Sequence, residues 1–429
     1  TLGSTTKAFT ATAITSLAQQ HGFSLDEPIK KWLPQFELSN QLISNMISIQ
    51  DLLSHRSGLG KFQGDFAFFD SDFTKNQMMQ KLNSFQLLND FRAFEYTNIG
   101  YFLVGQAVEA VSGKTYENYL QDAIFSPLDM TRTTAMTKEF LAANNKAAPH
   151  TLENGKVLPR EIGDISNMVA AGGISSSASD LSHWMIAQLG EGKYKGKQVI
   201  SPKVIEQVRS PKILIGRSNP PYTIFNNSNF ENYASGWYNI DYEGTEVVTH
   251  NGGTYGYSSS ITIIPEHNLG IAILTNSDTH LLFETIKLEI IDAYLGLPYR
   301  NYSKIAQQFF MPQLEMKSQH LTQLKEKVKA APTPILSLSK YEGTYKNDSY
   351  GNIEVSQKDE HLALRFQHHP DLVGTLQYIN EGKFLSSFNK SVYGNTIIPF
   401  EIVKGKIINM NFSVDENVEP NKYTFTKYK

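Results

Sequence analysis

Residues 3–11 read GSTTKAFTA, and this stretch decides how the rest of the chain is interpreted. Ser4 and Lys7 are three residues apart, which on a helix places both side chains on one face with Cβ atoms roughly 5–6 Å apart. A serine hydroxyl becomes a useful nucleophile when a nearby base takes its proton, and a lysine can be that base if burial lowers its pKa. Uncharged residues at helix spacing then continue to Gln20, and Gly22 follows as a C-cap, so we expect a buried helix over residues 4–20.

The Ser-x-x-Lys spacing is a weak signal when it stands alone. It occurs twice more, at Ser337/Lys340 and Ser387/Lys390, and the ordinary explanation of any single copy is a solvated helix or strand face. Only the first copy follows a glycine and opens a long, mostly uncharged helix. This context makes Ser4 the candidate nucleophile.

A second candidate element is the tripeptide Tyr96-Thr97-Asn98. A tyrosine can serve as a base or proton carrier, and an asparagine amide can hold a substrate carbonyl. In the alternative interpretation Tyr96 packs in the core and Asn98 caps the helix that is expected from residue 98 to Gly113.

The third element is the run His250-Asn251-Gly252-Gly253, at the end of an expected strand over residues 246–250. Glycines let a substrate lie against a strand edge and let an N–H group point at a developing oxyanion. Alternatively Asn251-Gly252-Gly253 is simply the turn that leads to further strands, over residues 258–264 and 269–275.

The three elements together resemble the serine hydrolase family that includes class C β-lactamases, penicillin-binding proteins with DD-peptidase activity, D-aminopeptidases and some esterases. They occur in the family's order, at a helix start, in a loop before a helix and on a strand edge. Further stretches resemble the family as well, and the resemblance extends over residues 1–298. These stretches are residues 51–59 (DLLSHRSGL), 94–100 (FEYTNIG), 170–181 (AAGGISSSASDL), 250–256 (HNGGTYG) and 273–276 (ILTN).

The resemblance implies an α+β fold, with an antiparallel sheet flanked by helices plus a helical region that carries Tyr96. After residue 340 only short β-rich runs remain, and they resemble the lipocalin-like antiparallel β-barrel attached to some family members. The expected strands cover residues 353–356, 362–366, 396–403, 407–412 and 422–426. We therefore expect a catalytic domain at 1–298, a helical linker at 299–338 and a barrel at 339–429. Family members have strands and a helix before the Ser-x-x-Lys helix, so we expect further residues upstream of Thr1.

The resemblance also implies an acyl-enzyme mechanism with defined roles. Ser4 is the nucleophile, Lys7 and Tyr96 share proton transfer, and the backbone N–H groups of Ser4 and Gly253 form the oxyanion hole. Asn98 and Gly252 bind substrate, and His250 stabilises Tyr96 or binds substrate. Many relatives that bind a substrate carboxylate have lysine where this chain has His250, and a neutral imidazole is a weaker anchor. The histidine form is closer to the aminopeptidase and esterase branches.

Several functions therefore stay open at this point. The first is a peptidase or amidase acting on D-amino-acid peptides, of the D-aminopeptidase or DD-carboxypeptidase type. A carboxylesterase for small acyl groups, a weak β-lactamase and a non-catalytic binding protein are the alternatives. The expected partners are a small peptide, amide or ester, and β-lactams.

Composition narrows the remaining possibilities. The chain has 429 residues, a net charge of −3 and no cysteine, which excludes disulfides and thiol nucleophiles and gives no electrostatic sign of nucleic-acid binding. No apolar run reaches the ~18 residues of a membrane span. His55, His150 and His183 form no metal-ligand spacing, so the sequence predicts neither a metal nor another cofactor. Family resemblance alone suggests export to the periplasm or exterior of a bacterium, and the oligomeric state stays open.

Overall fold

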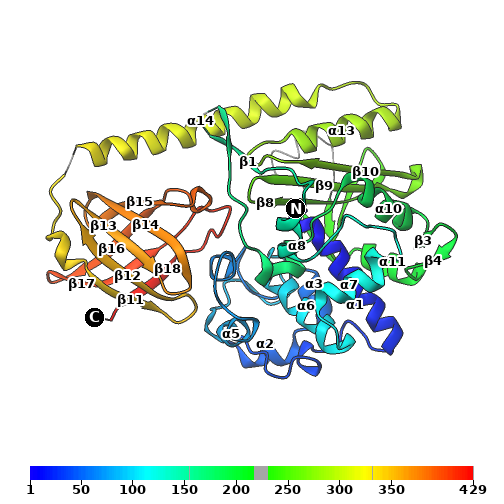
Figure 1. Cartoon of the computed structure of the whole chain (residues 1–429), viewed down its shortest axis with the longest axis horizontal. Coiled ribbons are helices and arrows are strands. Elements are labelled where there is room, and N and C mark those ends of the chain that lie inside the picture. The colour runs from blue at the N-terminus through cyan, green and yellow to red at the C-terminus, as the bar shows by residue number, and fades with distance from the viewer. Residues whose placement is uncertain (154, 217–229, 331, 429) are drawn as a thin grey trace. The chain divides into compact units, whose positions relative to one another are not determined.

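The computed structural model describes residues 1–153, 155–216, 230–330 and 332–428 (Figure 1). The chain divides into two compact units, which are treated separately here. Unit 1 comprises Thr1–Phe36, Gln41–Gly58 and Asn89–Met311. Unit 2 comprises Glu37–Asn40, Leu59–Leu88 and Pro312–Lys429.

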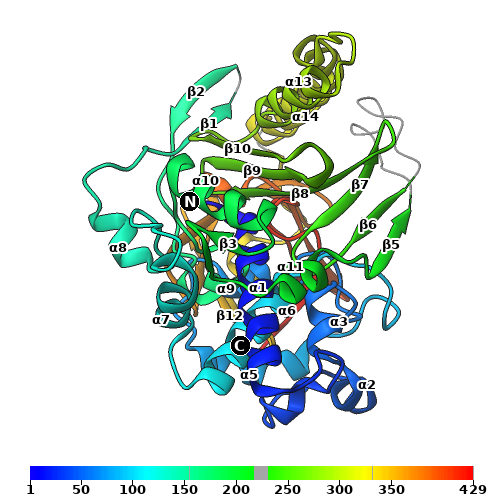
Figure 2. The same ribbon diagram turned by 90° about the vertical axis from the view of Figure 1, so that its right-hand side faces the viewer.

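Unit 1 is built on a six-stranded antiparallel sheet. In sheet order the strands are β10 (Leu269–Thr275), β9 (Tyr257–Ile264), β8 (Thr245–Thr254), β7 (Tyr238–Tyr242), β6 (Glu231–Tyr233) and β5 (Ile213–Gly216). Every residue of β9 is buried, because helices cover both faces of the sheet. Figure 2 shows α13 (Leu282–Leu295) and the start of α14 (Tyr302–Lys329) on one face, with α1 and α10 (Ala178–Leu189) on the other. The α+β, β-lactamase-like fold expected from the sequence is confirmed.

Helix α1 (Thr6–His21) is the central helix of unit 1. It follows the short 3-10 turn η1 (Gly3–Thr5), and its residues are buried almost without interruption from Thr6 to Ala18. Several buried threonines of this helix have bonded hydroxyls: Thr10 Oγ1 donates to Ala170 O at 2.6 Å and Thr12 Oγ1 to Ala8 O at 2.8 Å. The helix ends where Gly22 takes the left-handed conformation with φ 70°, as the sequence predicts.

Local signals also place the other helices near the site. Ser48 and Asp51 form a capping box at the start of α3 (Ile49–Leu53). Helix α6 (Asn98–Ser112) begins directly after Tyr96-Thr97 and ends at Gly113 with φ 68°. The remaining helices of unit 1 are α2 (Gln41–Met46), α7 (Tyr116–Leu120), α8 (Thr137–Ala142), α9 (Val169–Gly172) and α11 (Pro202–Arg209). Two small hairpins pair β1 (His150–Glu153) with β2 (Lys156–Pro159), and β3 (Lys193–Tyr194) with β4 (Lys197–Gln198).

One expected turn is wrong. Strand β8 continues to Thr254 and therefore includes Asn251, Gly252 and Gly253. The turn to β9 is made after the strand ends, at Gly256 with φ 73°. The strand runs on because its glycines pair with β9, with Gly252 opposite Ser259 and Gly253 opposite Ser258. An Asn-Gly pair favours a turn only where no longer-range pairing competes.

Unit 2 contains a closed eight-stranded antiparallel barrel, which confirms the expected barrel (Figure 1). Its strands are β11 (Gly343–Asn347), β12 (Gly351–Lys358), β13 (His361–Phe366), β14 (His369–Asn380), β15 (Lys383–Phe388), β16 (Ile397–Val403), β17 (Lys406–Phe412) and β18 (Tyr423–Lys427). The sequence analysis missed β11, β14 and β15. Aromatic side chains pack against one another among the buried residues, including Tyr345, Phe384 and Phe400. The barrel is therefore a packed core.

Residues Leu59–Leu88 belong to the same compact unit as the barrel, which the sequence analysis did not anticipate. This segment contains α4 (Asp65–Phe68) and α5 (Lys75–Lys81). It begins one residue after Gly58 and ends one residue before Asn89, so unit 1 continues on either side of it. We call it the inserted segment.

Among the described residues, no helix has both the length and the apolar character required to span a membrane.

Candidate active site

Ser4 and Lys7 lie together at the start of α1. Ser4 is half-buried in η1, whereas Lys7 is fully buried, and Lys7 Nζ is 3.0 Å from Ser4 Oγ. The same nitrogen is 2.7 Å from Asn98 Oδ1 and 2.9 Å from the carbonyl oxygen of Ala171 in α9. These two oxygens only accept hydrogen bonds, so Lys7 Nζ donates to both of them and to Ser4 Oγ, and loss of one of its protons would leave a lone pair free to face Ser4. The geometry is therefore suited to a lysine base.

Strand β8 passes directly beside the backbone of Ser4. A Cβ added at Gly252 would lie 1.9 Å from Leu2 O and 2.9 Å from Ser4 N. On the facing segment, Gly3 has φ 54°, and a Cβ there would lie 2.7 Å from Gly253 O. Gly3 and Gly252 are thus required for this close approach. A Cβ at Gly253, in contrast, would meet no atom within 4 Å among the residues that the structure describes, so Gly253 borders open space next to Ser4.

The contrast between the two glycines gives a testable prediction. Gly252→Ala should push β8 away from Ser4 and destabilise the fold by about 1–3 kcal/mol or more. The new Cβ would clash with backbone atoms, which cannot move aside as a flexible side chain can. Gly253→Ala should leave the melting temperature unchanged but lower turnover, if substrate lies along this edge. Thermal unfolding and steady-state kinetics of both variants test this. Equal melting temperatures for the two variants would contradict the packing argument.

Tyr96 lies in a cluster of aromatic and histidine side chains around Lys7. Its ring is 4.8 Å from Lys7 Nζ and 4.1 Å from the ring of His55, centroid to centroid, and 6.2 Å from the ring of His250. His55 Nδ1 accepts a hydrogen bond from the backbone N–H of Thr97 at 3.2 Å, which ties His55 to the start of α6. The structure thus brings together Ser4, Lys7, Tyr96, Asn98 and His250, with Gly252 and Gly253 alongside.

The hydrogen bonds of His250 define its tautomer. Its Nδ1 is 2.7 Å from Asn251 O, a pure acceptor, so Nδ1 carries the proton. Nε2 lies 3.1 Å from the hydroxyl of Tyr233 and accepts from it when the ring is neutral. Burial, and secondly the charge of Lys7, lowers the pKa of His250 to about 3. Burial likewise raises the pKa of Tyr233 well above its usual value, so the phenol remains a donor.

This depressed pKa predicts an acid-sensitive contribution to stability. Unfolded His250 takes up a proton below about pH 6.5, whereas folded His250 stays neutral down to about pH 3. The free energy of unfolding therefore contains the full contribution of neutral His250 above pH 6.5. This contribution is lost as the pH falls from 6.5 toward 3, by up to about 1.4 kcal/mol per pH unit. His250→Gln should flatten this slope in urea titrations. An unchanged slope would show that His250 is charged or exposed in the folded protein.

Sequence analysis did not identify several residues that support the site. Tyr233 in β6 reaches His250 through the β6–β7–β8 pairing, which a single sequence does not reveal. Behind the motif, the Asn251 side-chain amide donates to Glu284 Oε1, and Glu284 pairs with Lys287 at 2.6 Å on α13. Both charged residues are buried, and two opposite charges at spacing three in a largely apolar helix were a usable signal.

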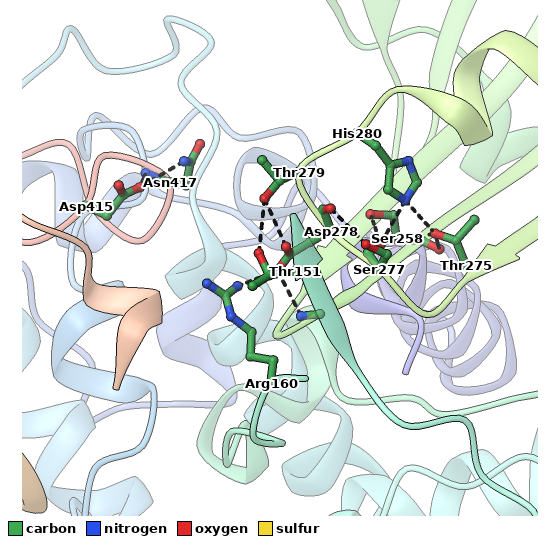
Figure 3. A network of polar contacts seen from close by, with 11 residues as sticks. Thr151, Arg160, Ser258, Thr275, Ser277, Asp278, Thr279, His280, Asp415 and Asn417 are labelled. Atoms are coloured by element: carbon green, nitrogen blue, oxygen red, sulfur yellow. Dashed lines mark hydrogen bonds and ion pairs between the residues drawn. The ribbon is translucent and has the colours of Figure 1, made fainter. Parts of the chain in front are cut away.

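A polar network fixes the turn that follows the glycines of β8 (Figure 3). The carboxylate of Asp278 accepts from Gly256 N at 3.0 Å and pairs with Arg160. Beside it, His280 Nε2 is 3.2 Å from Thr275 Oγ1, and Ser258 Oγ donates to Ser277 O at 3.1 Å. The network joins the β8–β9 turn to the ends of β2 and β10, which holds the Gly253 edge in place. In the described part of the chain, no group of three or more His, Asp or Glu side chains could hold a metal ion.

Comparisons with known proteins identify the family and the fold. Residues 1–293 match the β-lactamase family, and residues 327–427 match a domain of unknown function, DUF3471. A curated relative, the protein Flp of Staphylococcus aureus, is 26% identical over 314 residues. That match covers 71% of this chain but only 57% of Flp.

Solved structures share the fold at low identity. The octameric penicillin-binding protein homologue from Pyrococcus abyssi has a TM-score of 0.59 and 22% identity, covering 99% of this chain and 87% of that one. The D-amino acid amidase from Ochrobactrum anthropi SV3, solved with D-phenylalanine, has a TM-score of 0.51 and 24% identity, covering 64% of this chain and 85% of that one. The chain belongs to the β-lactamase family, shares the fold of these solved structures and has a C-terminal β-barrel.

Proposed function

We propose that the protein hydrolyses an amide or peptide bond next to a D-amino acid residue, as an amidase or aminopeptidase rather than as a carboxypeptidase. The observation that carries this is the burial of His250 and its contact with Tyr233, and burial lowers its pKa to about 3, which favours the neutral imidazole. A carboxypeptidase must pair the free carboxylate of its substrate with a cation, since an unpaired buried carboxylate is costly. A neutral His250 supplies no such charge, and Lys7 is engaged with Ser4, Asn98 and Ala171.

The proposed mechanism has two steps. Ser4 Oγ attacks the substrate carbonyl carbon as its proton passes to Lys7 or Tyr96, and the carbonyl electrons move onto the oxygen facing the N–H groups of Ser4 and Gly253. The C–N bond then breaks as the same pair returns the proton to the leaving amine. Water attacks the resulting ester, its proton is taken up by the pair, and Ser4 regains a proton as it leaves. Lys7 and Tyr96 interact closely enough that the base belongs to the pair.

The preference for D-residues rests on likeness in fold to the D-amino acid amidase, whose structure contains D-phenylalanine. Direct assays separate the possibilities. D-phenylalanine amide and L-phenylalanine amide test stereochemistry, and a D-alanine dipeptide with and without a C-terminal amide tests the charge preference. We expect the D-amide and the amidated dipeptide to be favoured in kcat/KM. A preference for the free carboxylate would refute the role given to His250.

A carboxylesterase for small acyl groups is the second candidate. A neutral His250 suits an ester as well as an amide, and Ser4 beside Lys7 attacks either carbonyl. Nitrophenyl esters assayed beside the amides distinguish the two, and intact-mass analysis with a β-lactam reports whether that ring acylates Ser4. If no amide, ester or β-lactam reacts, the protein is a binding protein.

Export from a bacterial cell rests on family resemblance alone, and cell fractionation tests it.

A further inference from the structure

The inserted segment packs on the barrel through a buried aromatic side chain. Phe66 of α4 is 3% exposed, and its ring stacks on His369 at 4.5 Å and meets Phe366 and Tyr393 at 5.7 and 5.6 Å, centroid to centroid. His369 Nε2 lies 2.7 Å from Phe66 O and 3.1 Å from Phe69 O, so it carries the proton and donates to both. The barrel thus holds both the side chain and the backbone of α4.

A buried carboxylate makes the second attachment. Glu419 of the barrel is 1% exposed, and it accepts hydrogen bonds from the backbone N–H groups of Gly64 and Phe66 at 2.8 and 3.0 Å. The hydroxyl of Tyr350 donates to it at 2.7 Å, and the hydroxyl of Tyr423 donates as well. A carboxylate with this many donors is satisfied only while the inserted segment stays in place, because half of the donors come from it.

The inserted segment is joined at both ends to the part of the chain around Tyr96. Residues 55–58 come before it, and residues 89–97, which include Tyr96, come after it. Asn89 N donates to Gly58 O at 3.1 Å, Arg92 N to Arg56 O at 3.2 Å and Glu95 N to His55 O at 2.9 Å. We call residues 55–58 and 89–97 the neck. At its inner end the ring of His55 packs against Tyr96, 4.1 Å away and tilted by 31°, and Nδ1 accepts from Thr97 N, so the conformation of the neck sets the position of the Tyr96 ring.

We propose that Glu419 is a positioning residue for Tyr96. By holding the inserted segment it constrains both ends of the neck, and the C-terminal barrel is thereby part of the hydrolase machinery rather than an independent appendage. Two covalent connections, at Gly58–Leu59 and Leu88–Asn89, carry the constraint. This inference rests on the proposed function, since it matters for catalysis only if Tyr96 transfers protons.

The test compares Glu419 with an exposed glutamate in the same loop. Glu416 lies three residues earlier, is 65% exposed and pairs with Lys317, so Glu416→Gln is the matched control. Glu419→Ala should increase amide hydrogen exchange in residues 89–97 and lower kcat by about tenfold or more with KM unchanged. Glu419→Gln keeps one acceptor oxygen and should recover part of both effects.

Two outcomes would overturn the proposal. One is faster exchange in Glu419→Ala that is confined to residues 59–88 and the barrel. The other is wild-type kcat in a variant whose neck has loosened. If Glu419→Ala fails to fold, Tyr423→Phe removes a single donor and is measured in the same way, with the same two results deciding. If the wild-type protein turns over no substrate, the proposed function fails, whereas the exchange data still decide whether Glu419 constrains the neck.

Discussion

Ser4→Ala should abolish covalent labelling by a fluorophosphonate and lower kcat by several orders of magnitude, as loss of a serine nucleophile does elsewhere. The physical reason is that Ser4 Oγ lies 3.0 Å from the buried Lys7 amine at the start of α1, where backbone N–H groups favour developing negative charge. The fold should persist, because a half-buried hydroxyl is removed without a cavity. Intact-mass and peptide-mass analysis locate the adduct, and circular dichroism checks the fold.

The two other Ser-x-x-Lys pairs serve as internal controls. Ser337 and Lys340 are exposed, and Lys390, which follows Ser387, is paired with Asp70 at 3.2 Å. Neither serine has a buried amine beside it, so Ser337→Ala and Ser387→Ala should leave labelling and turnover unchanged. An adduct on either of these residues, or full labelling of Ser4→Ala, would overturn the assignment of the nucleophile.

Features that depend on nearby residues could be predicted from the sequence. The ends of α1 and α6 at Gly22 and Gly113 follow from interactions within one turn of helix. The contact between Ser4 and Lys7 is local in the same sense. Each of these expectations needed no knowledge of distant parts of the chain.

Features that depend on distant pairing could not be predicted in this way. Gly252 and Gly253 stay in β8 because β9 pairs with them, and the need for glycine at 252 comes from Leu2 O, some 250 positions away. Tyr233 reaches His250 only through the register of three strands. The inserted segment joins the barrel through Glu419, more than 350 positions from Gly64. The hydrophobic periodicity of a single sequence indicates helices and strands, but it does not indicate which distant segments are in contact.

The protonation state of His250 could not be predicted either, because it depends on residues that are distant in the sequence. From sequence its imidazole was a pH-dependent anchor for substrate. In the fold, burial, and secondly the charge of Lys7, lowers its pKa to about 3, which favours the neutral imidazole near neutral pH. The environment that makes this change is contributed by β6, β8 and α1 together.

Lys7→Arg should lower kcat/KM by about 10²–10⁴-fold even though it keeps the positive charge, because a guanidinium cannot act as a base near neutral pH. Asn98 Oδ1 and Ala171 O, at 2.7 and 2.9 Å, both accept from the single nitrogen Nζ, whereas a guanidinium would place three nitrogens in the same buried site. Tyr96→Phe should also impair acylation, since it removes the other member of the proton-transferring pair. Single-turnover kinetics with an amide substrate measure the acylation step directly.

Lys287→Arg is the matched control for this substitution. Lys287 is also buried, at 5% exposure, but its partner is the carboxylate of Glu284 at 2.6 Å, and an arginine can keep an ion pair with a carboxylate. Any loss in Lys287→Arg therefore measures the cost of placing a larger cation in the core, seen as a lower melting temperature. A Lys7→Arg variant that folds and acylates at the rate of the wild type would mean that Lys7 contributes only its charge. Tyr96 would then have to take the proton of Ser4 alone.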